Sequence, residues 1–242
     1  APAPYNFLGT GRNTQTDQKW SARLDWNLSE KDKVFGRFSY MDSNLSFIGV
    51  FPYSGSETPV HSRNVSVGWT HIFSPRMVNV VRVGLDHVFV AAGAPYGSAT
   101  NPDFGAILGL KNLKSPAACN SLTSVSVQGV SGFGGATSCE VPTNNNPIYS
   151  DNFSYQVARH YITLGGQLIQ FRENDIVSFD ANGSLGFNGQ FSGNGVADFI
   201  LGYPNQASGG QWQGPMNRRA WWPSLYINDE FKVIPNLTLS YG

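Results

Sequence analysis

The chain has 242 residues, and its 16 basic and 16 acidic side chains give a formal net charge of zero. A neutral chain argues against a nucleic-acid partner, and a hydrophobic content of 40% argues against global disorder. Charged residues make up only 13% of the chain, whereas aromatic residues reach 13% and glycines number 27. This composition favours extended strands joined by polar loops.

The first predicted hairpin lies within residues 19–40. Apolar and polar side chains alternate strictly along 19–28 and again along 34–40, which is the period of a strand with two different faces. The polar residues 29–32 form the predicted turn. If Leu28 pairs with Val34, Asp25 lies opposite Arg37, and we expect an ion pair between the two strands.

Three further hairpins follow the same plan, with predicted turns at 74–76, 159–160 and 234–236. Pro223 lies inside the strand pattern of the last hairpin, which predicts a sheet edge, a bulge or a later strand start there. A weaker pair of strands across 176–213 brings the expected total to about ten. The strand pattern at 237–242 has no stop signal after it, so we expect the chain to be cut within a strand.

The connections alternate in length. The four turns are short, whereas residues 42–62 and 91–149 form long connections rich in Gly, Ser, Asn and Pro. Short turns on one side and long loops on the other are the plan of an outer-membrane barrel. The sequence therefore predicts an all-β protein, an antiparallel meander of about ten strands from a transmembrane β-barrel. The loop 91–149 is expected to be extracellular.

Strand parity separates the side chains of each strand into two sets. The apolar set would contact outer-membrane lipid, and the polar set would line the lumen or contact a plug. The predicted lumen-facing residues are Arg23, Asp25, Arg37, Arg82, Asp86, Gln167, Asn228 and Glu230. A secreted or surface β-rich adhesion module is the alternative, because any half-buried antiparallel sheet has the same alternation.

Several segments of the chain, taken in their order along the sequence, resemble segments of a known protein family. Residues 23–29 (RLDWNLS) with 34–40 (VFGRFSY), residues 197–204 (ADFILGYP) and residues 228–242 (NDEFKVIPNLTLSYG) resemble segments of Oar-like TonB-dependent outer-membrane receptors. The phrase at 159–166 (RHYITLGG) is similar to a recurring turn and strand of that family. The resemblance covers about residue 20 to residue 242.

The resemblance implies a transporter that takes up a scarce substrate. In such receptors a plug domain, which carries the energy-coupling box, precedes a barrel of about 22 strands. Neither plug nor box is found here, so residues 1–242 are expected to form a partial barrel. The implied partners are the plug and the remaining barrel strands, a TonB-type energy-coupling complex acting through the plug, and an unknown small-molecule or peptide substrate. Loop 91–149 is the candidate for substrate capture.

No enzymatic chemistry is predicted. The sequence has no nucleophile elbow, phosphate-binding loop, His-Glu-x-x-His or Cys-x-x-Cys motif, and no cofactor or metal is expected. The four histidines have no metal spacing and are expected at interface or turn positions. Residues 180–184 are read as a turn rather than a calcium loop, and Glu173 with Asp175 as a solvated rim.

Cys119 and Cys139 both lie in the long loop. A disulfide is the preferred interpretation, because the cell exterior is oxidising and loop closure would stabilise the fold by about 3 kcal/mol. Free or metal-bound thiols are the alternative. Two short segments, 102–110 and 196–202, are predicted to be helical within the loops.

Overall fold

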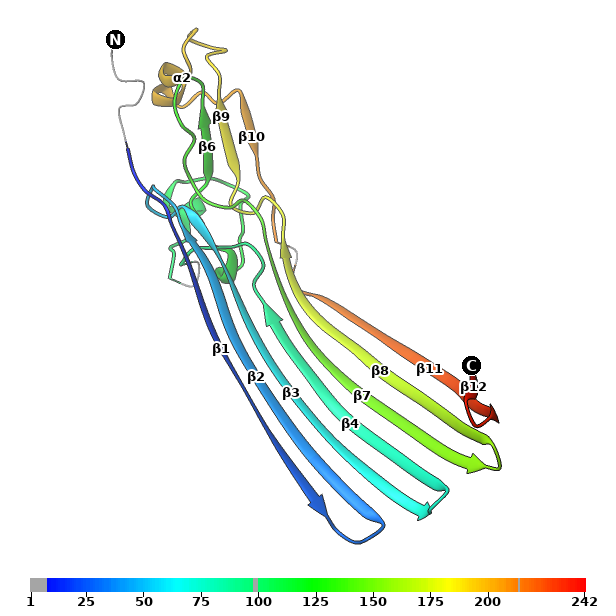
Figure 1. Ribbon diagram of the computed structural model, residues 1–242. Helices are drawn as coiled ribbons and strands as arrows, with labels where there is room; N and C mark the ends of the chain where they lie inside the picture. The colour runs from blue at the N-terminus through cyan, green and yellow to red at the C-terminus, as the bar shows by residue number, and fades with distance from the viewer. Residues whose placement is uncertain (1–7, 98–99, 213) are drawn as a thin grey trace.

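The computed structural model describes residues 8–97, 100–212 and 214–242. Within these residues a nine-stranded sheet follows the chain in the order β1-β2-β3-β4-β7-β8-β11-β12, with β5 added beside β3. Every strand pair of this sheet is antiparallel. The predicted all-β antiparallel meander is therefore confirmed (Figure 1).

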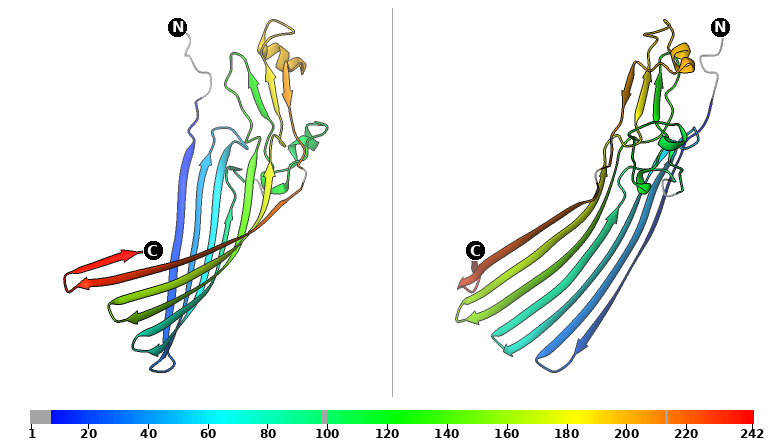
Figure 2. Two further views of the ribbon diagram at one scale, coloured as in Figure 1. Left: turned by 90° about the vertical axis from the view of Figure 1, so that its right-hand side faces the viewer. Right: turned by 180° about the vertical axis from the view of Figure 1, so that it is seen from behind.

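The long strands have 14 to 20 residues, more than the roughly 9–11 that cross a bilayer when tilted. They are β1 (Arg12–Asn27), β2 (Asp32–Ile48), β3 (Gly55–Ser74), β4 (Met77–Val90), β7 (Cys139–Val157), β8 (His160–Ser178) and β11 (Met216–Ile234), followed by the shorter β12 (Leu237–Tyr241). The sheet is strongly twisted, so that β11 crosses the direction of β1 in the side view (Figure 2).

All four short turns lie where the sequence predicted them, at one end of the sheet (Figure 1). In the first, the Ser29 hydroxyl accepts hydrogen bonds from the backbone N–H of Lys31 and of Asp32. In the third, Ala158 has a positive φ of 52°. We call this the short-turn end of the sheet and the opposite end the loop end.

The predicted long connections are shorter than expected. Residues 42–62 are mostly strand, because β2 and β3 stay paired from Asp42 opposite His61 to Ile48 opposite Gly55. Similarly, β7 begins at Cys139, so residues 139–149 of the predicted loop belong to a strand. The sequence pattern did not predict these strand extensions, because their side chains are largely polar. Paired strands that project into water need no apolar face.

The register of the first hairpin differs from the prediction by two residues. Trp26, rather than Leu28, lies opposite Val34, and Arg23 lies opposite Arg37. The expected ion pair between Asp25 and Arg37 is therefore wrong, and Asp25 pairs instead with Arg23 on its own strand at 2.7 Å. A shift of two residues keeps every side chain on its face, so the hydrophobic pattern could not detect it.

Pro223 lies inside β11, opposite Leu168. Strand β12 pairs with β11 only over Asp229–Ile234. Within the described residues, Pro223 therefore has a neighbouring strand on one side, which is the predicted edge position.

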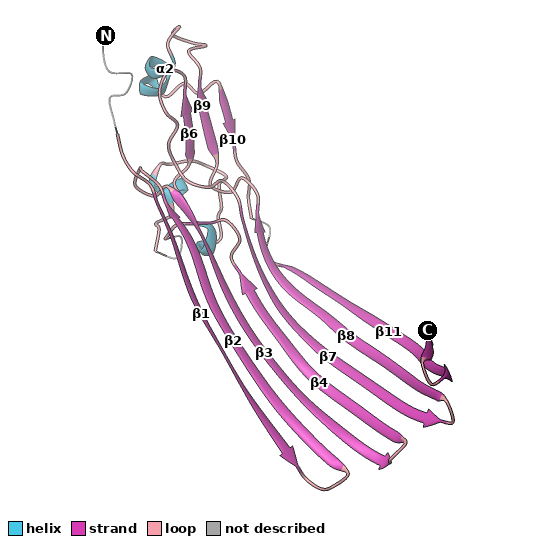
Figure 3. Ribbon diagram, viewed as in Figure 1, coloured by secondary structure: helices cyan, strands magenta, loops and turns pink. Residues whose placement is uncertain are grey.

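The loop end carries a cap formed by two connections, residues 91–138 and 179–215. The first contains β5 (Ala94–Pro95), α1 (Phe104–Ile107), a 3₁₀ turn at Ala117–Cys119 and β6 (Ser124–Val127); the second contains β9 (Ser184–Phe187), α2 (Gly195–Leu201) and β10 (Gln206–Ser208). Strands β6, β9 and β10 form a separate small sheet in which β6 and β9 run parallel. In the part of the chain that the structure describes, the helices lie in the cap (Figure 3) and overlap both predicted helical segments. The weaker predicted strand pair also belongs to the cap.

Candidate functional site

The long sheet has one apolar and one polar face. Leu24, Val67, Leu164 and Leu225 share the first face, and their side chains are 73%, 50%, 46% and 90% exposed. Large side chains normally avoid this degree of exposure over a continuous surface. Among the described residues no second sheet covers this face, so the two-sheet packing that the adhesion alternative requires is absent.

The strand register places all eight predicted polar residues on the opposite face. The pairings Arg23–Arg37, Gly68–Arg82, Asn64–Asp86 and Ser150–Gln167 connect five of them across β1 to β8, and Asp25 lies two positions from Arg23 on the same face of β1. The other two lie on β11, with Asn228 opposite Thr163 and Glu230 opposite Tyr161. The residues that share this face are Arg23, Asp25, Arg37, Arg82, Asp86, Gln167, Asn228 and Glu230.

Only some of these eight polar residues lie close to one another. Arg82 and Gln167 line a hollow of about 260 Å³ on the polar face. Asn64, which also lines it, donates a hydrogen bond to Asp86 at 3.1 Å. Asn228 and Glu230 lie on another strand near the short-turn end, so the eight residues form a polar surface rather than one site.

Polar side chains limit the apolar face at both ends. Asp32 and Asp42 on β2 are ten positions apart, as are His61 and His71 on β3 and Arg219 and Asp229 on β11. Between each pair the residues of this face are mainly apolar or aromatic, including Trp69 and Trp221. Ten positions correspond to about 33 Å along a strand.

Carboxylates hold the histidines at these limits. His71 Nδ1 lies 2.7 Å from Asp32, and His160 Nδ1 lies 2.6 Å from Asp229, both at the short-turn end. At the loop end His61 Nδ1 lies 2.8 Å from Asp42. Within the described residues, no group of three or more His, Cys, Asp or Glu side chains is placed to hold a metal ion.

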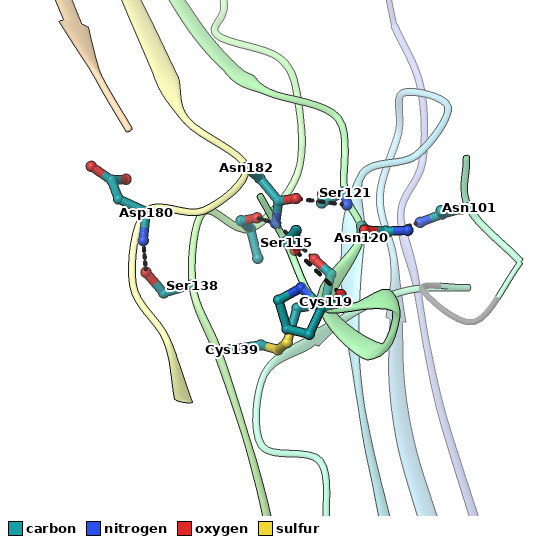
Figure 4. The surroundings of a disulfide bond; sticks show 11 residues. Asn101, Ser115, Cys119, Asn120, Ser121, Ser138, Cys139, Asp180 and Asn182 are labelled. Atoms are coloured by element: carbon teal, nitrogen blue, oxygen red, sulfur yellow. Dashed lines mark hydrogen bonds between the residues drawn. A yellow bond between two sulfur atoms is a disulfide. The ribbon is translucent and has the colours of Figure 1, made fainter. Parts of the chain in front are cut away.

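A disulfide joins the cap to the long sheet. Cys119 and Cys139 are bonded, with their Cα atoms 5.8 Å apart, and Cys119 is fully buried. The side-chain amide of Asn182 donates to the Cys119 carbonyl at 2.7 Å and accepts from the Ser121 N–H at 3.1 Å (Figure 4). Asn182 thereby joins the two chain segments that form the cap. Residues 180–183 form the predicted turn, in which the Gly183 N–H donates to the Asp180 carbonyl at 3.0 Å.

Helix α2 is held by the fully buried carboxylate of Asp198. Its oxygens accept backbone hydrogen bonds from Ser192 at 2.8 Å and Phe191 at 3.2 Å. Hydrogen bonds from Ser192, together with the backbone N–H of Phe191, lower the pKa of Asp198. Asn194 caps the helix start, and Gly202 ends it with a left-handed φ of 72°.

The cap contains a cleft of about 250 Å³ between residues 110–113 and strands β9 and β10. Ser184 and Ser208 lie on its wall, with their hydroxyl oxygens 2.7 Å apart. Thr123 also borders the cleft, and its buried hydroxyl makes no hydrogen bond within the described residues. Lys111 and Asn112 add an amine and an amide, so the cleft can hold a small molecule with hydroxyl or carbonyl groups.

Glycines give this cleft its shape. A Cβ atom at position 209 would lie 2.3 Å from a Leu113 methyl carbon, and one at position 183 would lie 2.9 Å from the other. Leu113 therefore packs directly against two glycine backbones. Predicted loop 91–149 supplies residues 110–113 and 123 to the cleft, but the remaining wall comes from residues 183–185 and 207–209, which the sequence did not indicate.

The predicted solvated rim at Glu173 and Asp175 is wrong. Asp175 is fully buried, and Arg218 of β11 bonds both carboxylates at 2.8 Å. The sequence could not reveal this site, because Arg218 is 43 positions from Asp175. Asn182 and Asp198 were likewise missed as structural residues, although both belong to segments that the sequence had singled out.

Comparison with known proteins gives one match. A family model described as an outer membrane beta barrel domain matches residues 1–242. Neither the curated proteins nor the solved structures contain a match to the chain. No helix in the described part of the chain is long and apolar enough to cross a membrane.

Proposed function

The chain belongs to the outer membrane β-barrel family and lies in the bacterial outer membrane, and from that premise we propose that it is a barrel segment of an Oar-like TonB-dependent transporter. The observation that carries this proposal is the division of one sheet into an exposed apolar face and a continuous polar face, with a ligand-sized cleft at its loop end. The four sequence segments similar to Oar-like receptors support the family assignment within the barrel class.

In this proposal the apolar face contacts lipid. The polar limits of the face are about 33 Å apart along a strand, which at a tilt of 35–45° spans about 25 Å across the membrane. That is the height of the apolar band in outer-membrane barrels. The tryptophans near these limits, Trp69 and Trp221, supply interfacial aromatics.

The polar face lines the lumen and contacts a plug. Arg82, Gln167 and Asn64 line a hollow that can receive polar groups of a plug loop, and Asp86 accepts a hydrogen bond from Asn64 beside it. Energy would reach the barrel through a TonB-type complex that pulls on the plug. No covalent chemistry is required for this function.

The cleft in the cap is the proposed site of substrate capture. Because the short turns of such barrels are periplasmic and the longer loops extracellular, the cap faces the medium. The Ser184–Ser208 hydroxyl pair and the side chains of Lys111 and Asn112 suit a hydroxyl-rich or carbonyl-rich small molecule, and the Cys119–Cys139 disulfide joins the cap to the long sheet.

A photo-crosslinking residue at Arg82 or at its neighbour Val83 tests the arrangement in whole cells. Val83 lies on the apolar face and is 47% exposed, so it should crosslink to lipid, whereas position 82 should crosslink to a plug segment. Lipid adducts from position 82 would contradict the lumen assignment.

Transport itself is tested by comparing the growth medium of wild-type cells with that of cells lacking the protein. A transporter depletes a compound that the deletion strain leaves behind, and a protonophore abolishes the depletion. An adhesion role predicts equal depletion but reduced surface attachment, and that result would overturn the proposal.

A further inference from the structure

Two arginines face each other directly across β8 and β11. Arg172 and Arg219 are paired in the strand register, and both are exposed. Like charges directly opposite in a sheet are destabilising. Such an arrangement therefore calls for a compensating group of opposite charge.

No carboxylate supplies that compensation. Within the described residues neither arginine has an ion pair, whereas Arg23, Arg63 and Arg218 each bond an aspartate. The nearest acidic residues along β8, Glu173 and Asp175, bond Arg218 on the opposite face.

Neutral groups hold both guanidinium groups in place. Arg219 donates to the Glu173 and Arg218 carbonyls, each at 2.7 Å, and to the Asn174 side chain at 2.6 Å. Arg172 donates to the Gln170 side chain. These contacts position the two side chains but leave both positive charges unbalanced.

The pair lies at the loop-end limit of the apolar face. Trp221 is two positions from Arg219 on the same face, and the exposed Leu225 and Ile227 follow it towards the short-turn end. If this face contacts lipid, as the proposed function states, both arginines reach the headgroup layer of the outer leaflet. The planar guanidinium group matches phosphate through parallel N–H···O contacts, and phosphate is the anion that the headgroup layer supplies.

We propose that Arg172 and Arg219 form a binding site for a phosphate group of lipid A, the phosphorylated lipid anchor of lipopolysaccharide in the outer leaflet. The two guanidinium groups bind the phosphate from adjacent strands, and Trp221 lies against the sugar or upper acyl region. The lipid phosphate supplies the negative charge that the protein lacks here.

Native mass spectrometry of the detergent-purified protein, titrated with lipid A, measures the interaction. We expect the variant Arg172→Gln/Arg219→Gln to bind diphosphorylated lipid A at least ten-fold more weakly than the wild type, since two charge-assisted contacts are lost. The control variant Arg37→Gln/Arg82→Gln removes the same charge from the polar face and should bind lipid A like the wild type.

Two further binding measurements use the unaltered protein, so they do not depend on the folding of a variant. Lipid A treated to remove its phosphates should bind much more weakly than the diphosphorylated form, and inorganic phosphate at the same concentration should not displace lipid A. Equal binding of both lipids, or equal binding by the wild type and the Arg172/Arg219 variant, would overturn the proposal. Displacement by free phosphate would identify a site for soluble anions instead.

This proposal rests on lipid contact by the apolar face, but the two can fail separately. If a crosslinker at Val83 captures lipid while the Arg172/Arg219 variant still binds lipid A normally, the barrel orientation stands and the phosphate site does not. If Val83 captures no lipid, the orientation itself is wrong.

Discussion

The membrane orientation of the sheet can be tested at adjacent positions of one strand. Leu164 on β8 lies on the apolar face, opposite Phe153 and Ile227, and is 46% exposed. It is four positions from His160 and eight from Arg172, the limits of the apolar face on β8, or about 13 Å and about 26 Å along the strand. Leu164 is therefore about 7 Å along the strand from the middle of the apolar band.

An arginine near the bilayer midplane costs about 2–4 kcal/mol on the lipid face of a barrel. Leu164→Arg should therefore lower the free energy of unfolding by about 3 kcal/mol, which reduces the ratio of folded to unfolded protein by on the order of 100-fold. Thr163→Arg is the matched control, because Thr163 faces the other way, between Ser154 and Asn228.

Both variants are made in the protein as it occurs in outer membranes and are refolded into lipid vesicles. Loss of the heat-sensitive, fast-migrating gel band during urea titration measures unfolding. The Leu164 variant should unfold at clearly lower urea than the wild type, and the Thr163 variant close to it. Equal behaviour of the two variants, or the reverse order, would refute the assignment of the apolar face to lipid.

Three further predictions concern the cap. Replacing Cys119 and Cys139 by serine removes a closure spanning 20 positions and should destabilise the cap by about 3 kcal/mol; protease cleavage within residues 91–138 should rise, and unchanged cleavage would show that the disulfide is dispensable. Because hydrogen bonds lower the pKa of Asp198, its contribution to stability is complete above the ordinary aspartate value of about 3.9 and is lost as the pH falls through the lowered value; the hydrogen-exchange protection of residues 187–205, measured relative to the intrinsic exchange rate at each pH, should therefore fall in acid, and Asp198→Asn should lower it already at neutral pH. Gly209→Ala places a Cβ 2.3 Å from a leucine methyl of the cleft wall and should reduce uptake of the depleted compound, whereas Gly186→Ala meets its nearest atoms at an ordinary 3.5 Å and should not.

The cap gives the proposed substrate cleft an ordered scaffold. Its small sheet and its disulfide form a compact unit from two connections, with a core of Val125, Val127 and Phe187. Phe199 of α2 packs edge-on against Phe187, with ring centroids 5.3 Å apart. The cleft is therefore built on ordered elements, which suits selective binding better than flexible loops do.

Alternation along the strands was sufficient to predict the fold class, the four short turns and the face on which each strand residue lies. The physical reason is that side chains on a strand have a period of two, so a single strand already separates its apolar and polar residues. All eight predicted polar residues therefore lie on one face of the sheet, although the sequence contains no information about which of them meet.

Tertiary structure decided the register, the strand lengths and the cap. A two-residue shift preserves the faces, so only the turn and the cross-strand contacts distinguish Trp26 from Leu28 as the partner of Val34. The extensions of β2 and β7 depend on pairing with distant strands rather than on local apolar pattern. Other contacts join residues that are tens of positions apart, such as the bonds of Arg218 to Glu173 and Asp175 and the contacts of Asn182 between the two cap connections. The local alternation of side chains cannot predict such contacts.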